Sequence, residues 1–148
     1  MNVEVLRVDL DSPAAEELAC FAENCSWVAG KHMAGLIRQK LFEEWESMFF
    51  ARYEDQIIGY CTIRKTDYYP ENKYSPWISG VFVDENYRGH RVSQRMINFA
   101  EQYAKTIGFH KVYIPSGMIG FYEKYGYTYI DDLMNYAGDI EHVFYKEL

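Results

Sequence analysis

The sequence has few of the features that mark secreted, metal-binding or membrane proteins. Only 3 of its 148 residues are cysteines, Cys20, Cys25 and Cys61, and they form neither an even set nor a Cys-x-x-Cys pair. This count argues against a disulfide framework or a zinc site, so we interpret the three as small core residues. No apolar run is long enough to cross a bilayer, and the first residues lack the basic and then apolar pattern of a secretory signal. We therefore expect a cytoplasmic protein with no membrane partner.

Basic residues are also scarce, because 15 lysines and arginines stand against 22 acidic residues and leave a net charge of -7. Binding to nucleic acid depends on basic surface that displaces counterions from phosphates, so we expect no nucleic-acid partner. The acidic balance suits a cationic substrate better. A length of 148 residues with 49% hydrophobic residues is typical of one domain with one substantial core, and we predict a single domain over residues 1–148.

The positive charge that is present gathers where an apolar strand runs into a helix. Arg88, Arg91 and Arg95 give residues 88–95 a charge of +3, which leaves -10 on the remainder of the chain. The first backbone N–H groups of a helix lack intrahelical partners and lie at the positive end of the helix dipole, so this loop is suited to a diphosphate. The three arginines would otherwise be solvated residues at a helix start. Because arginine there opposes the dipole, we favour an anionic ligand.

Strand and helix patterns alternate along the chain, which predicts a mixed sheet with helices on both faces. We expect strands at residues 3–6, 48–53, 57–64, 77–83, 112–114, 127–130 and 143–145, with a hairpin turn at Glu54-Asp55-Gln56 and a loop at 66–76. Helices are expected to start at Pro13, to cover about 31–43, to follow the arginine loop as far as Gly108, and to cover 118–125 before Gly126. Helical spacing predicts their buried faces as Ala14, Leu18, Phe21 and Cys25, then Met33, Leu36, Ile37 and Leu41, then Val92, Met96, Phe99, Ala100, Tyr103 and Ile107, with Glu101 on the polar face of the third.

Three segments of the second half carry a resemblance to a known family. Val81-Phe-Val83, Tyr87-Arg-Gly-His-Arg-Val-Ser93 and Phe121-Tyr-Glu-Lys-Tyr-Gly-Tyr127 resemble, in order and spacing, motifs of the GNAT superfamily of acetyl-CoA-dependent N-acetyltransferases. The first half agrees only in its strand, two helices and hairpin. The resemblance implies an α/β (α+β) fold with a mixed, mostly antiparallel central sheet of about six to seven strands flanked by about four helices.

The resemblance also implies site residues and a reaction. Backbone groups of the strand would hold pantetheine and polarise the thioester carbonyl, and the arginine loop would hold the diphosphate. The residues implied for acetyl-CoA are Val81, Phe82, Val83, Arg88, Gly89, His90, Arg91, Val92 and Ser93. A primary amine of a small molecule or peptide would attack the acetyl group directly, with no metal, and Tyr122 would protonate the departing thiolate. Tyr122 is otherwise a core aromatic residue among 14 tyrosines.

The sequence departs from the family pattern in three places. Arg91 stands where the loop usually has glycine, which implies either an altered turn or an added contact to a phosphate of the cofactor, and we favour the contact. Pro115 and Ser116 lie where an asparagine often helps hold pantetheine, so Ser116 is at best a substitute. Trp77 occupies the strand position where many members place a glutamate as general base.

No general base is therefore assigned from the sequence. An alkylamine with a pKa of ~10.4 is neutral in about one molecule in 2500 at pH 7, equivalent to about 4.6 kcal/mol, so a group must take its proton or bind its neutral form. His32 on the second predicted helix is a candidate, and an ordinary surface histidine is the alternative. Structural roles are expected for His90, His110 and His142.

The acceptor and the partner remain open in the sequence. The loop at 66–76 has two interpretations: its carboxylates and tyrosine rings could form the wall of a site for a cation, or it could be an ordinary soluble surface. The residues concerned are Asp67, Tyr68, Tyr69, Glu71 and Tyr74. Two further functions compete with the enzyme, namely a non-catalytic module that binds or senses CoA and an unrelated α/β phosphate-binding protein. The oligomeric state is open, a homodimer included.

Overall fold

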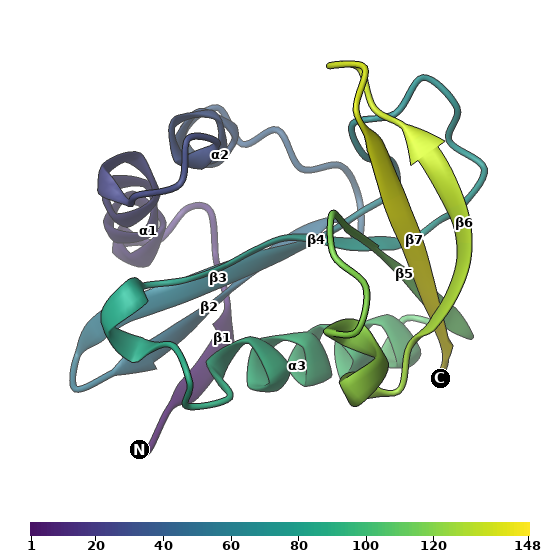
Figure 1. The fold of residues 1–148 in the computed structure, drawn as a ribbon. Coiled ribbons are helices and arrows are strands. Elements are labelled where there is room, and N and C mark those ends of the chain that lie inside the picture. Colours follow the sequence, from purple (N-terminus) through teal and green to yellow (C-terminus); the bar gives the residue numbers. More distant parts are fainter. The chain divides into compact units, whose positions relative to one another are not determined.

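A computed structural model describes all residues from Met1 to Leu148 and contains seven strands, three α-helices and two short 3-10 helices (Figure 1). In chain order these are β1 (Glu4–Arg7), α1 (Pro13–Asn24), α2 (Gly30–Arg38), β2 (Ser47–Tyr53), β3 (Gln56–Arg64), β4 (Trp77–Val83), η1 (Glu85–Tyr87), α3 (Val92–Thr106), β5 (Lys111–Ser116), η2 (Tyr122–Tyr125), β6 (Thr128–Met134) and β7 (Ile140–Glu147).

The strands form a sheet in the order β1-β2-β3-β4-β5-β7-β6. β4 and β5 pair in parallel, whereas β1 with β2, β5 with β7, and β6 with β7 pair antiparallel. The predicted mixed, mostly antiparallel sheet is confirmed, with three α-helices where the resemblance implied about four.

The chain divides into two compact units. The first unit consists of Met1–Thr62 and Gly80–Ile97, and the second unit consists of Ile63–Ser79 and Asn98–Leu148. Strands β3 and β4 and helix α3 each contribute residues to both units. The expectation of a single domain stays a prediction.

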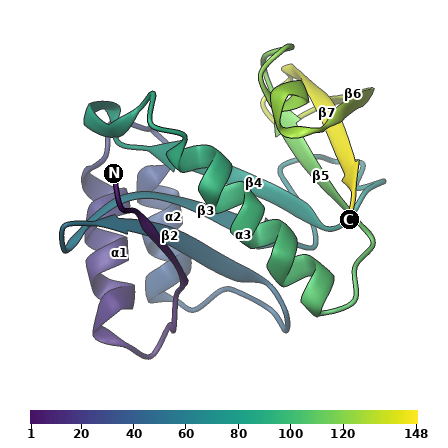
Figure 2. The same ribbon diagram turned by 90° about the horizontal axis from the view of Figure 1, so that it is seen from below.

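In the first unit, α1 and α2 cover one face of the strands and the start of α3 covers the other (Figures 1 and 2). Successive side chains of β3 point to opposite faces of the sheet. Tyr60 belongs to the core cluster beneath α1 and α2 and stacks on Phe82 of β4, with ring centroids 5.6 Å apart. Its neighbour Cys61 lies on the α3 side, where the sulfur is 3.9 Å from the backbone oxygen of Met96. The period of two in a strand explains this division.

Helix α1 starts at Pro13 as predicted, but its buried face differs from the predicted one. The buried residues are Leu18 and three alanines, Ala15, Ala19 and Ala22, whereas Ala14, Phe21 and Cys25 are only partly buried. Small residues let α2 approach closely. A Cβ atom added at Gly30 of α2 would lie 2.0 Å from the backbone oxygen of Ala22.

Helix α2 ends at Arg38, five residues earlier than predicted. Lys40 adopts a left-handed φ of 54°, and the N–H of Leu41 donates to the oxygen of Leu36 at 2.9 Å. This closing turn satisfies a carbonyl at the helix end and turns the chain away from the helix axis. Leu41 is therefore 49% exposed, although its spacing placed it on the buried face.

The hairpin between β2 and β3 is confirmed. Glu54 and Asp55 have φ values of 48° and 64°, which is the pattern of the two-residue type I′ turn that matches the twist of paired strands.

In the second unit, the buried face of α3 differs from the predicted one. Phe99 and Ile107 are 38% and 41% exposed, whereas Glu101, predicted on the polar face, is buried. The Tyr127 hydroxyl donates to Glu101 at 2.7 Å and the Lys146 ammonium lies 3.1 Å from it. A buried carboxylate is tolerated because these partners replace its hydration.

The predicted helix at 118–125 is reduced to the 3-10 helix η2. Gly120 has a left-handed φ of 98° and breaks the helical run, and its N–H donates to the Glu123 carboxylate at 3.0 Å. Gly126 ends η2 with a φ of 92°, as predicted.

The cysteines are free thiols, and only Cys61 is fully buried. Cys25 is partly buried and Cys20 is exposed, so the interpretation of all three as core residues was wrong for Cys20. None of the helices combines the length and hydropathy needed to cross a bilayer.

Candidate active site

The loop between β4 and α3 presents positive charge at a helix start. The 3-10 helix η1 is capped by Asp84, whose carboxylate accepts from the N–H of Asn86 at 2.9 Å. The chain then runs exposed through four residues, 88–91, and α3 begins at Val92 with no acidic residue in its first turn. The side chain of Arg95 is also exposed. The first N–H groups of a helix lack intrahelical partners, and the exposed arginines add positive charge, so this corner of the first unit is suited to an anion.

Arg91 occupies the glycine position of the loop with a left-handed backbone. Its φ is 62°, in the left-handed region that glycine favours, and Gly89 has a φ of 84°. A side chain in this region costs roughly 1–2 kcal/mol, and such residues gather at ligand sites. A left-handed φ at Arg91 is the backbone that glycine would favour at this position, and both the contact to phosphate and the alternative of an altered turn stay predictions.

Arg88 is tied to the end of β4. Its Nε donates to the backbone oxygen of Val83 at 2.9 Å, and its guanidinium lies 5.7 Å from the ring centroid of Phe82. The Phe82 side chain is buried between Tyr60 and Trp27. Val83 is also buried, whereas Val81 is partly buried, and the role that the resemblance implied for the backbone of this segment stays a prediction.

Gly80 interrupts β4 with a φ of 60°. A Cβ atom there would lie 2.7 Å from the terminal carbon of Met33, so α2 packs directly on this residue. The space in front of Gly80 is therefore filled by the Met33 side chain of the first unit.

Tyr122 opens η2 in the second unit. It is buried, and its ring centroid lies 5.0 Å from that of Phe121 and 6.2 Å from that of Phe144. These surroundings keep the residue in an apolar environment. Ser116 is also buried, and its hydroxyl oxygen accepts from the N–H of Met118 at 3.0 Å, so it stabilises the turn after β5.

The predicted acceptor loop is built into an aromatic cluster of the second unit. Tyr69 and Tyr74 pack on the buried Trp77, with ring centroids 5.4 and 6.2 Å away. Their hydroxyls donate to carboxylates of the β6–β7 hairpin, Tyr69 to Glu141 at 2.6 Å and Tyr74 to Asp131 at 2.7 Å. The indole N–H of Trp77 is buried without a hydrogen-bond partner.

The other members of this loop are more exposed. Tyr68 is 57% exposed and lies against Tyr136, with ring centroids 5.2 Å apart. Glu71 is exposed and pairs with Lys73 at 3.5 Å.

A scan against protein-family models matches residues 13–127 to the Acetyltransferase (GNAT) family. This chain belongs to the GNAT family. Its arginine loop, its β4 backbone and Tyr122 all lie within the matched residues. No curated protein matches this GNAT chain.

Solved structures share the fold of this GNAT protein at low identity. An aminoglycoside 6'-acetyltransferase type Ii is 17% identical with a TM-score of 0.75, and the match covers 97% of this chain and 96% of that one. An aminoglycoside 6'-N-acetyltransferase from Enterococcus faecium is 14% identical with a TM-score of 0.73 over the same shares. A GNAT acetyltransferase from Elizabethkingia anophelis with acetyl-CoA bound is 18% identical, with a TM-score of 0.69 and 99% of both chains covered.

The four histidines of this GNAT protein lie in different parts of the structure and have different contacts. His32 is exposed on α2, and His90 is exposed in the arginine loop. His142 lies 2.6 Å from a carboxylate oxygen of Asp132, and the backbone oxygen of His110 accepts from the N–H of Leu148. No group of three or more histidines, cysteines and carboxylates is placed to hold a metal ion.

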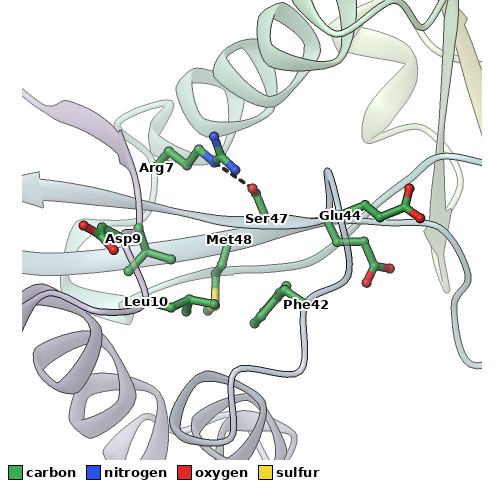
Figure 3. Close-up of a pocket in the computed structure, with 9 residues that line it drawn as sticks. Arg7, Asp9, Leu10, Phe42, Glu44, Ser47 and Met48 are labelled. Atoms are coloured by element: carbon green, nitrogen blue, oxygen red, sulfur yellow. Dashed lines mark hydrogen bonds between the residues drawn. The ribbon is translucent and has the colours of Figure 1, made fainter.

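A cavity of about 400 Å³ opens in the first unit of this GNAT protein beside β1 and β2 (Figure 3). Its polar lining includes Asp9, Glu44 and Glu46, and Arg7 donates to the Ser47 hydroxyl at 2.7 Å. Leu10, Phe42 and Met48 form its apolar side. None of the residues predicted for acetyl-CoA or for catalysis lines this cavity.

Proposed function

We propose that this GNAT protein is a cytoplasmic N-acetyltransferase that moves an acetyl group from acetyl-CoA to a primary amine of a small molecule or peptide. The observation that carries the proposal is the exposed loop before α3, where Arg91 has a left-handed backbone and the first turn of α3 contains no acidic residue. Family membership supplies the reaction class.

The residues of the loop fit the diphosphate of CoA. Gly89 and Arg91 have left-handed backbone, and a Cβ atom at Gly89 would meet nothing within 4 Å, so there is space for a phosphate to approach closely. Arg88 would add a charged donor beside the end of β4, to which it is already bonded. The backbone of Val81, Phe82 and Val83 would then hold the pantetheine arm.

The chemistry requires a proton at sulfur. The amine nitrogen forms a bond to the acetyl carbon while the carbon–sulfur bond breaks, and the thiolate must then be protonated. A thiolate whose conjugate thiol has a pKa of ~8.5 can accept a proton from a phenol with a pKa of ~10 at a cost of about 2 kcal/mol. The proton donor that we propose is the hydroxyl of Tyr122, a buried residue.

Two structural relatives support an amine of a small molecule as the acceptor. Both are described as aminoglycoside acetyltransferases, and aminoglycosides carry several primary amines. The excess of acidic residues in this chain suits such a cation.

Thiol release from acetyl-CoA with a panel of amines tests the proposal. Wild-type protein is expected to release thiol with at least one amine, and Tyr122→Phe is expected to lower kcat about 100-fold. Tyr125→Phe, which removes the hydroxyl of a half-buried tyrosine from the same short helix, is the matched control and should retain activity. Equal activity of wild type and Tyr122→Phe would overturn the role of Tyr122.

A CoA sensor without turnover is the second candidate. It is favoured by Trp77, which is fully buried at the position where the family resemblance expects a glutamate base. Calorimetry that detects CoA binding, together with no thiol release for any amine, would establish the sensor. The third alternative, an unrelated phosphate-binding protein, is excluded by the family match.

A further inference from the structure

The proposed reaction needs a group that removes a proton from the acceptor ammonium, and the structure points to one that the sequence did not single out for this role. Asp67 lies in the loop between β3 and β4, and it was predicted only as part of a wall for a cation. Its carboxylate is partly buried in the second unit and hydrogen-bonds to the hydroxyl of Ser79 on β4. Ser79 precedes Val81, where the thioester carbonyl is expected, by two residues of the same strand.

We propose that Asp67 is the general base of this acetyltransferase and takes the proton of the acceptor ammonium, directly or through one water molecule. The inference rests on the proposed function. The Asp67 carboxylate, which reaches β4 from the preceding loop, would take the role of the glutamate that many family members place on the strand.

The local structure holds the Asp67 side chain in place. One carboxylate oxygen accepts from the N–H of Tyr68 at 2.8 Å, and the Asp67 N–H donates to the Asn72 side chain at 3.1 Å. The backbone oxygen of Asp67 accepts from the N–H of Tyr69, also at 2.8 Å. A base must be oriented before the substrate arrives, and these bonds provide that orientation.

The charges around Asp67 suit a base at neutral pH. Burial is the main cause that raises the pKa of Asp67 to about 6, and the negative charge of Glu141 on β7 adds to it. The Tyr68 N–H, the positive charge of Arg64 on β3 and the Ser79 hydroxyl act in the opposite direction. A carboxylate with this pKa is ionised at pH 7 and is a stronger base than an ordinary aspartate.

The buried Trp77 side chain next to this loop also lowers the stability of the protein. The indole N–H of Trp77 is buried without a partner, and the Trp77 ring packs on Tyr69, whose hydroxyl holds Glu141. Buried donors without partners are rare and destabilising, and proteins retain such departures chiefly at functional sites. His32, the candidate from the sequence, is exposed and lacks a comparable setting.

The proton balance of the step is complete. The ammonium loses one proton to Asp67, and the neutral amine attacks the acetyl carbon. Tyr122 gives its proton to the sulfur of CoA, and the second proton that leaves the nitrogen as the amide forms restores the Tyr122 hydroxyl. The proton held by Asp67 passes to water after product release.

The pH dependence of kcat/KM tests the proposal on the full chain with an amine that wild type accepts. Wild type is expected to lose activity below about pH 6, the pKa range of Asp67. Asp67→Asn is expected to lower kcat/KM about 100-fold at pH 7. Its deficit should shrink as the pH approaches the pKa of the amine, because the neutral amine then forms without a base.

Two neighbouring substitutions separate a base from a structural residue. Glu141→Gln removes a negative charge and is expected to move the acid limb of the profile to lower pH, whereas Ser79→Ala removes a hydrogen bond to the carboxylate and is expected to move it to higher pH. Asp139→Asn, an exposed aspartate of the second unit, is the charge-matched control and should leave the profile unchanged.

The outcomes are distinguishable from failure of the proposed function. Absence of thiol release by wild type with every amine would overturn both proposals. An active wild type with an unchanged Asp67→Asn profile, or acid limbs that do not move in Glu141→Gln and Ser79→Ala, would overturn the base alone. Calorimetry should show unchanged CoA affinity in Asp67→Asn, because the loop before α3 is intact.

Discussion

The Tyr127 hydroxyl donates to a carboxylate oxygen of Glu101 at 2.7 Å, although the helical pattern of α3 placed Glu101 on a solvent-facing surface. We expect Tyr127→Phe to lower the free energy of unfolding by about 1–3 kcal/mol, because the buried carboxylate loses a donor. Urea denaturation at pH 7 measures the change. Tyr129→Phe is the control, since its hydroxyl bonds to Asp132 on the surface, and a smaller loss is expected there. Equal losses would contradict the buried role of Glu101.

Gly59 is required by close packing between β3 and β4. A Cβ atom there would lie 2.7 Å from the backbone oxygen of Phe82 and 3.2 Å from the terminal carbon of Met96. We expect Gly59→Ala to destabilise the protein by about 1–3 kcal/mol, since the backbone must shift to relieve the overlap. The control is Gly117→Ala, where a Cβ atom meets nothing within 4 Å and the change should stay within about 0.5 kcal/mol. Thermal or urea denaturation of both variants decides the comparison.

The strain and the charge of Arg91 can be separated by two substitutions. Arg91→Gly removes the guanidinium and relieves the left-handed backbone, whereas Arg91→Ala removes the guanidinium and keeps the strain. Both are expected to raise the KM for acetyl-CoA about tenfold, equivalent to about 1.4 kcal/mol. Arg91→Gly should be the more stable of the two by about 1 kcal/mol.

Steady-state kinetics and urea denaturation measure these two effects independently. We expect discrimination among amines to change less than the KM for acetyl-CoA, in Arg91→Ala as in Arg88→Ala. A selective change in amine preference would place the cofactor away from this loop.

Asp67 is expected to make stability fall as the pH rises. Its pKa is higher in the folded than in the unfolded state, so the folded state binds more protons between about pH 4 and pH 6, and stability decreases across that window. Asp67→Asn should therefore be more stable than wild type at pH 7, by on the order of 1 kcal/mol, and lack this decrease. Denaturation between pH 4 and pH 7 tests the sign.

Asp131 provides the opposite case within the same unit. The hydrogen bond from Tyr74 lowers the pKa of Asp131, so its contribution is present above the pKa of the unfolded state and is lost as the pH falls through the folded value. Asp131→Asn should accordingly be less stable than wild type at pH 7 and approach wild type in acid. The same direction of change in both aspartate variants would show that the charges around Asp67 are not those described.

Patterns that depend on neighbours in the chain could be predicted from the sequence. Pro13 marked the start of α1, the Glu54-Asp55 turn marked a hairpin, and Gly108 and Gly126 marked the ends of helical segments, because backbone conformation at these points is set by the residue itself. The bounds of α2 were not predictable in this way. Leu41 fits the helical period, but the turn at Lys40 ends the helix first.

The residues of the candidate site also differ in whether the sequence alone could reveal them. The arginine loop and Tyr122 were found from motifs, because residues that contact a cofactor can lie close together in the chain. Asp67 was not identified as a base from the sequence, since its environment depends on Glu141 and Ser79, which lie far from it along the chain. A raised pKa depends on burial and neighbouring charge, and neither is visible in the local sequence.

By itself, the sequence determined the family, the alternation of strands and helices and the position of the arginine loop, since these depend on residue type, spacing and order. Only the tertiary structure decided that Glu101 is buried with partners, that Arg91 keeps a glycine conformation, and that Asp67 lies in a partly buried setting beside β4. Burial, hydrogen-bond partners and local electric field arise where distant segments meet, because the free energy of a polar group depends on what surrounds it.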